Sequence, residues 1–208
     1  MFNFDPVTMV LRIPALLIAI TVHEFAHARV AYAYGDATAK AYGRMNLNPI
    51  SHLDPIGTLM IILVGFGWAK PVPINPYNFR NYRAGLRWVS LAGPLANFTL
   101  AFLSLVLFRV LILSGAGGLF LSFMAVMVQL NILLGVFNLI PIPPLDGSKI
   151  LVSLAPDSFV DFFHQIEPYA PIILLVLIIT RALSYILFPL YDLILNLFNA
   201  IIRLIPGL

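Results

Sequence analysis

The sequence predicts an all-α polytopic membrane protein: a helical transmembrane bundle with a short re-entrant or β-hairpin element between the first two long helices. Hydrophobic residues make up 61% of the 208 residues and charged residues only 10%, whereas soluble domains are about half apolar and about one quarter charged. The mean hydropathy is +0.96, and several apolar stretches reach the roughly 20 residues that a membrane helix needs. These observations exclude a soluble globular domain.

Four stretches have the length and composition of membrane helices, and they cover residues 10–33, 88–113, 119–140 and 171–190. The tail over 191–206 is also apolar, with Asp192 and Arg203 near its ends. This tail fits either a fifth span or a helix that lies in the membrane interface, and its composition does not decide between them.

The segment 55–74 is not expected to cross the membrane. Its apolar part of about a dozen residues is short for a span, and it carries three glycines and runs into two prolines, which break helices. Basic residues flank it on both sides: Arg29, Lys40 and Arg44 before it, and Lys70, Arg80, Arg83 and Arg87 after it. Because the positive-inside rule places both groups in the cytoplasm, the segment is predicted to re-enter the membrane or form a hairpin.

This topology makes the first long helix run inward, the second outward and the third back. The uncharged turn SGAGG at 114–118 fits an external loop. The stretch PIPPLDG at 141–147 then emerges on the side where the first helix ends. We predict one domain over residues 1–208, with a core at about 10–150 and C-terminal helices at about 171–206.

Two histidines and a glutamate lie inside the first apolar stretch, in the sequence HEFAH. In the pattern H-E-x-x-H, His23 and His27 face the same side of a helix and can hold two corners of a zinc tetrahedron. Glu24 lies beside the metal and can take a proton from a bound water. The alternative, simple hydrogen bonding within the bundle, is disfavoured because ionisable groups inside a membrane usually mark a functional site.

A catalytic zinc needs a third protein ligand, and the chain has no cysteine to supply it. The candidate donors outside the first helix are His52, Asp54, Asp146, His164 and Glu167. Asp146 follows a helix-breaking PIPP and precedes Gly147, so extended backbone could carry its carboxylate back into the bundle.

The other candidates have simpler interpretations. Asp54 followed by Pro55 is typical of a helix N-cap with proline at the first position. His164 and Glu167, three residues apart, fit a solvated or interfacial amphipathic helix on the cytoplasmic side.

Three motifs follow one another along the chain: HEFAH at His23 to His27, AGPLAN at Ala92 to Asn97 and NLIPIPPLDG at Asn138 to Gly147. In these motifs and their order the chain resembles the site-2 protease family, peptidase family M50, whose members are intramembrane zinc metalloproteases. The resemblance covers most of residues 15–150. The chain looks like the compact bacterial or archaeal branch, with no room for a PDZ or CBS module.

The resemblance implies a six-helix or similar core in a prokaryotic cell membrane, with an active site accessible from the cytoplasm. It implies one Zn2+ per chain bound by His23, His27 and Asp146, with Glu24 as general base. The implied reaction is cleavage of a peptide bond within or beside a transmembrane helix, as in regulated intramembrane proteolysis. The expected partners are a transmembrane protein or signal-peptide substrate and membrane lipid. A net charge of +3 reflects topology signals, and no nucleic acid is expected.

Asn138 and Asn97 match motif asparagines of the family, and a role in positioning the substrate is the functional interpretation for each. The alternative is that each forms a hydrogen bond between helices, a common use of asparagine in membranes. At the level of the whole protein, the competing functions are an ion transporter, in which His, Glu and Asp form an ion path, and a catalytically silent membrane scaffold.

Overall fold

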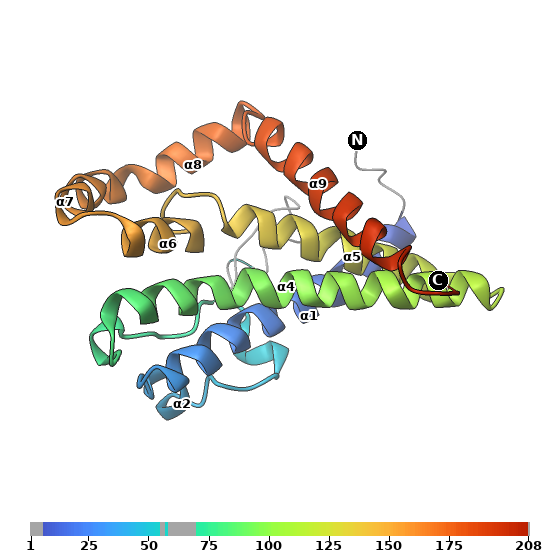
Figure 1. The fold of residues 1–208 in the computed structure, drawn as a ribbon, viewed down its shortest axis with the longest axis horizontal. Helices are drawn as coiled ribbons and strands as arrows, with labels where there is room; N and C mark the ends of the chain where they lie inside the picture. The colour runs from blue at the N-terminus through green and yellow to red at the C-terminus, as the bar shows by residue number, and fades with distance from the viewer. Residues whose placement is uncertain (1–5, 55–56, 58–69, 208) are drawn as a thin grey trace.

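The computed structural model describes residues 6–54, 57 and 70–207, and within these ranges the chain is built from helices and their connections, with no β-strand (Figure 1). The all-α prediction is therefore confirmed. Most of the predicted re-entrant or hairpin element at 55–74 lies outside the described residues. Its described end, at 70–74, is irregular chain, so nothing in the described part supports a hairpin.

Within the described residues, four helices are long and apolar enough to cross a membrane: α1 (Pro6–Ala33), α4 (Tyr82–Leu113), α5 (Leu119–Asn138) and α9 (Ser184–Ile202). The first three lie where the sequence predicts them. α4 begins at Tyr82 instead of residue 88 because Asn81 caps it: the Asn81 side chain accepts a hydrogen bond of 2.9 Å from the Ala84 N–H.

The predicted span at 171–190 is wrong. α8 (Ala170–Ile179) has only 10 residues, and the chain then turns at Arg181, whose φ of 59° is incompatible with a continuing right-handed helix. α9 begins at Ser184 and runs without a break through the tail that the sequence left open. The apolar composition continues across the turn, which is why hydropathy alone places the span too early.

Shorter helices cluster at one end of the bundle, which is called the α2 end below (Figure 1). They are α2 (Thr38–Ala41), η1 (Pro49–His52), η2 (Pro76–Asn78), α6 (Asp146–Leu154), α7 (Asp157–Ile166) and η3 (Glu167–Tyr169). The predicted turn at 114–118 joins α4 to α5 at the opposite end, where Gly115 and Gly118 have φ of 71° and 79°. α1 and α5 thus run toward the α2 end and α4 runs away from it, in the predicted alternation.

The core of the bundle is the packing of α4 against both α1 and α5. α1 approaches its neighbours closely because the side chains on its inner face are small: Ala15, Ala19, Ala28 and Ala31 are all 0% exposed. Small side chains at helix interfaces let backbones in a membrane come close together. This close approach positions the polar residues of α1 against α4.

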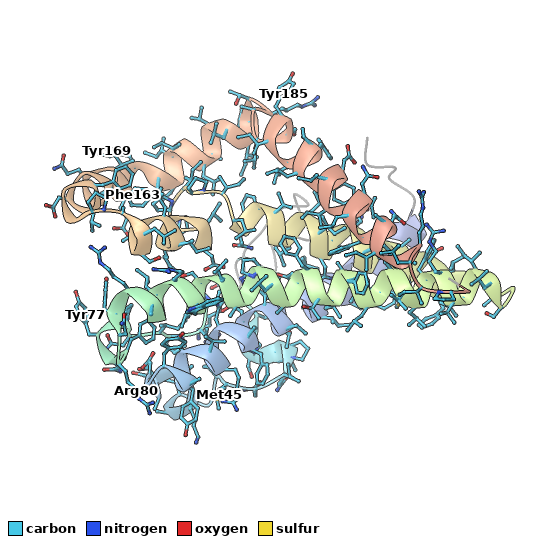
Figure 2. The ribbon with its side chains drawn as sticks, in the orientation of Figure 1. Met45, Tyr77, Arg80, Phe163, Tyr169 and Tyr185 are labelled. Atoms are coloured by element: carbon cyan, nitrogen blue, oxygen red, sulfur yellow. The ribbon has the colours of Figure 1, made fainter. Side chains whose placement is uncertain are left out.

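Residues 70–78, here called the strap, cross the α2 end beside α1. The Arg44 guanidinium donates a hydrogen bond of 2.8 Å to the Lys70 carbonyl, and the Lys70 N–H donates one of 3.0 Å to the His52 carbonyl. Val72 is buried against Ala28. Figure 2 shows that Tyr77 lies at the end of the bundle where α4 begins.

Asp36 fastens the other half of the strap. It is 1% exposed, and its carboxylate accepts hydrogen bonds of 2.8 Å from the Asn75 N–H and from the Asn78 amide. It also accepts hydrogen bonds from the hydroxyl and the N–H of Thr38. Burial opposes ionisation, but these donors outweigh it and hold the pKa of Asp36 below its usual range.

We expect Asp36→Asn to lower the free energy of unfolding by about 1–3 kcal/mol at pH 7, because the amide leaves buried donors unpaired. Because the folded-state pKa is lowered, the contribution of Asp36 is present above its unfolded pKa of about 3.9 and is lost as pH falls through the folded pKa. In detergent, the difference in melting temperature between wild type and Asp36→Asn should therefore become smaller below about pH 4. A difference that stays constant with pH would contradict this prediction. The control is Asp161→Asn, at an exposed position.

Candidate metal centre

α1 places the two histidines of HEFAH one turn apart, with their Nε2 atoms 2.9 Å from each other. Asp146 lies 119 residues beyond His27, at the start of α6, yet its Oδ2 is 3.2 Å from His23 Nε2 and 3.0 Å from His27 Nε2. The three residues are only 5–6% exposed. Among the residues that the structure describes, this is the group of His, Cys, Asp or Glu that could hold a metal.

The loop between α5 and α6 brings Asp146 to this position. After α5 ends, the chain folds on itself through a hydrogen bond of 2.9 Å from the Leu145 N–H to the Ile142 carbonyl. Gly147 lies so close to this loop that a Cβ there would be 2.2 Å from the Leu139 carbonyl oxygen. Only glycine allows α6 to begin against this backbone, which explains the glycine that follows Asp146 in the sequence.

Both imidazoles are held by hydrogen bonds that they donate from Nδ1, the ring nitrogen that faces away from the centre. His27 Nδ1 donates to the Val89 carbonyl at 2.6 Å, and His23 Nδ1 donates to Asn97 Oδ1 at 2.6 Å. Because a carbonyl can only accept, His27 must carry its hydrogen on Nδ1 when neutral. Its Nε2 then presents a lone pair, as metal binding requires.

α4 leaves space for the centre at Gly93. A Cβ at this position would be 2.4 Å from His27 Nε2 and 2.5 Å from His23 Cε1. The glycine in AGPLAN therefore lets α4 pass directly against the Nε2 edges of the two imidazoles.

The donor set fits zinc. Bonds of about 2.0–2.1 Å in a tetrahedron place neighbouring ligand atoms about 3.3 Å apart, close to the 2.9–3.2 Å seen here. Asp146 Oδ2 lies 3.0–3.2 Å from both Nε2 atoms, so its carboxylate can supply the third ligand oxygen. Two histidines and one carboxylate leave a fourth position for water or substrate.

Glu24 is half-buried, and its carboxylate is held by the strap. Its Oε2 accepts a hydrogen bond of 2.8 Å from the Val72 N–H. Since Pro71 and Pro73 have no N–H, Val72 supplies the one main-chain donor in this Pro-Val-Pro stretch. The strap thereby fixes the carboxylate that follows His23 in the sequence, a contact across 48 residues that sequence reasoning missed.

Three of the other candidate ligands, His52, Asp54 and Glu167, have described side chains and are not part of the centre. His52 is buried in η1, where its Nε2 bonds to the Asn46 carbonyl at 2.9 Å. Asp54 Oδ1 accepts a hydrogen bond of 2.8 Å from the Gly57 N–H, as its predicted N-cap role requires. Glu167 lies in η3 with an exposed side chain, and the side chain of His164 lies outside the described part of the structure.

The two motif asparagines have different surroundings. The Asn138 amide donates to the Leu134 carbonyl at 2.9 Å within its own helix. Asn97 is fully buried and contacts His23 directly. Their roles in substrate positioning stay predictions, whereas the contact of Asn97 with a histidine of the centre is one that sequence reasoning missed.

Comparison with known proteins identifies the family of this chain. The family model of peptidase family M50 matches residues 113–178. The chain is 44% identical over 201 residues to the protein named "Putative zinc metalloprotease YwhC" of Bacillus subtilis, covering 90% of each chain. This chain belongs to peptidase family M50. No solved structure matches this M50 chain.

More distant relatives of the M50 chain carry the same kind of name. It is 32% identical over 180 residues to Rip2 of Mycolicibacterium smegmatis, which covers 84% of this chain and 69% of Rip2. It is 28% identical over 151 residues to MJ0611 of Methanocaldococcus jannaschii, covering 72% of this chain and 73% of that protein. The family, the names and the donor set together identify Zn2+ as the metal of this membrane protein.

Proposed function

We propose that the M50 chain is an intramembrane zinc metalloprotease that hydrolyses a peptide bond within or beside a transmembrane helix of a membrane protein. The observation that carries this proposal is the burial of two histidines and an aspartate around one point on α1, inside its candidate membrane span. A carboxylate fixed by the strap follows the first histidine. We assign His23, His27 and Asp146 as ligands and Glu24 as general base.

A zinc ion held by His23, His27 and Asp146 would supply a Lewis acid for the scissile carbonyl and would lower the pKa of the attacking water. Glu24 accepts the proton of that water and passes it to the amine that leaves. The hydrogen bond from the Val72 N–H holds one carboxylate oxygen, so the other oxygen is free to exchange the proton. His23 and His27 keep their Nε2 atoms toward the reaction through their Nδ1 contacts.

A transmembrane helix must unwind locally before it can be cut, because its carbonyls are hydrogen-bonded within the helix. We propose a transmembrane protein or a signal peptide as substrate, presented from the surrounding lipid. Asn97 and Asn138 are proposed to help position it. For Asn97 this role would act through His23, since the Asn97 amide oxygen already accepts from that imidazole.

We also propose that the active site opens toward the cytoplasm. The basic residues at the α2 end are Arg29, Lys40, Arg44, Lys70, Arg80, Arg83, Arg87 and Lys149. The turn at 114–118 on the opposite side has no charge. The positive-inside rule then supports a cytoplasmic α2 end, and the centre lies on the half of α1 nearer to that end.

The test is cleavage by the purified protein in liposomes that contain single-span substrates, with mass spectrometry to locate the cut. We expect cuts within or next to the span, lost when a chelator removes zinc and restored when zinc is returned. Liposomes loaded with a zinc-sensitive dye test the competing transporter. Zinc flux without cleavage would contradict the proposal and support the transporter. Cleavage of soluble peptides alone would also contradict the proposal.

A further inference from the structure

Asn131 is a buried polar residue on α5, a helix that supplies none of the three proposed zinc ligands. It is 0% exposed in a helix whose residues are mostly apolar. Its amide nitrogen donates to the Met127 carbonyl at 2.8 Å, and its amide oxygen accepts from the Asn97 amide at 2.9 Å. A buried amide costs free energy unless it is hydrogen-bonded, and Asn131 meets this need by contacting α4.

The direction of each hydrogen bond in this network is forced by the one before it. The Met127 carbonyl can only accept, so the Asn131 nitrogen must face it and the Asn131 oxygen must face Asn97. Asn97 then has to present its nitrogen to Asn131, which leaves its oxygen for His23. An amide oxygen can only accept, so His23 must carry a hydrogen on Nδ1.

A second carbonyl supports the same orientation of Asn97. The Asn97 nitrogen also donates to the Ala19 carbonyl at 3.0 Å, so both of its hydrogens are used. Asn97 and Asn131 are each 0% exposed, so bulk water does not compete for these hydrogen bonds. The network therefore joins α1, α4 and α5 through amides alone and ends at the imidazole of His23.

We infer that Asn131 is a positioning residue of the zinc centre: it orients the Asn97 amide so that His23 is held as the tautomer with a free Nε2. The inference rests on the zinc centre of the proposed protease and is independent of which bond that protease cuts. A wild type that binds zinc and cleaves nothing would refute the proposed function and leave this inference intact.

Two substitutions separate the two hydrogen bonds of Asn131. Asn131→Ser keeps a donor that can reach the Met127 carbonyl, as helical serines commonly do, but its side chain is too short to accept from Asn97. Asn131→Asp keeps the oxygen that faces Asn97 and, in its protonated form, a donor for Met127. We expect Asn131→Ser to weaken zinc binding about tenfold, at the lower end of what residues that orient metal ligands contribute, and Asn131→Asp to stay within about threefold of wild type.

The measurement is zinc affinity by chelator competition in detergent, beside the melting temperature of each zinc-free protein. If Asn131 acts through packing alone, Asn131→Asp should bind zinc more weakly than Asn131→Ser, because a buried carboxyl group costs more free energy than a serine hydroxyl. This result would overturn the inference. Equal zinc affinities for both variants and wild type would also overturn it. If Asn131→Ser does not fold, Asn131→Asp decides: wild-type affinity supports the inference and a tenfold loss overturns it.

A double-mutant cycle tests whether Asn131 acts through Asn97. In the Asn97→Leu background, Asn131→Ser should weaken zinc binding no further, because the contact it removes is already absent. A full tenfold loss in both backgrounds would show that Asn131 acts by another route. Ser104→Ala, another buried polar position on α4, is the matched control and should leave zinc affinity unchanged.

Discussion

Glu24→Gln should reduce cleavage by about 10²–10⁴-fold, the usual contribution of a general base, while the protein keeps about one zinc per chain. Glutamine retains an oxygen that can accept from the Val72 N–H, so the contact with the strap survives. The amide cannot take up the proton of the attacking water. Cleavage of a reconstituted substrate and metal analysis of the same preparation measure the two effects together.

Asp146→Ala tests the loss of a zinc ligand and is compared with Glu24→Gln, which tests the loss of the general base. It removes the ligand that approaches both imidazoles to within 3.2 Å, so zinc and cleavage should be lost together. Equal zinc in Asp146→Ala and wild type would remove Asp146 from the centre. Full cleavage by Glu24→Gln would assign proton transfer to another group and contradict the proposed mechanism.

The parts of the site that could be predicted are those encoded within a few residues. The spacing of His23 and His27 is one helical turn, and their place inside an apolar stretch already indicates a function. Asp146 could be proposed because a helix-breaking PIPP precedes it and glycine follows it. In each case the local sequence determines both the backbone and the chemistry.

The parts that could not be predicted depend on contacts between distant segments. Asn97 could be matched to a motif, but its contact with His23 spans 74 residues and its contact with Asn131 spans 34. Nothing local to Asn131 shows which helix it faces. An asparagine among the apolar residues of a membrane helix indicates a buried partner, and this was the one available signal.

The error at the C-terminus has a different cause. Hydropathy measures composition over a window, and the turn at Arg181 interrupts the helix without interrupting the apolar composition. The single basic residue is too weak a signal to move a window of about 20 residues. Hydropathy also misses the first six residues of α4, which precede its apolar part. The start of this helix is determined by the Asn81 cap, and a hydropathy window does not detect a cap.

Gly93→Ala should abolish zinc binding, and cleavage with it, although it adds a single methyl group. The new Cβ would be 2.4 Å from His27 Nε2 and within 2.6 Å of two atoms of the His23 ring. Neither imidazole can move aside freely, because Val89 and Asn97 hold both rings from behind at 2.6 Å. The methyl group must therefore displace the ligand atoms themselves or push α4 away from α1.

Zinc per chain and the melting temperature in detergent are measured together, to distinguish a folded protein that has lost its zinc from a protein that has unfolded. Overpacking by one methyl costs about 1–3 kcal/mol, a loss that a folded bundle can survive, so the variant should purify as a folded protein with an empty centre. Gly117→Ala, in the turn where an added Cβ meets nothing within 4 Å, should bind zinc like wild type. Wild-type zinc affinity in Gly93→Ala would mean that α1 and α4 separate without cost, and that the close helix packing described here is not what holds the two histidines in place.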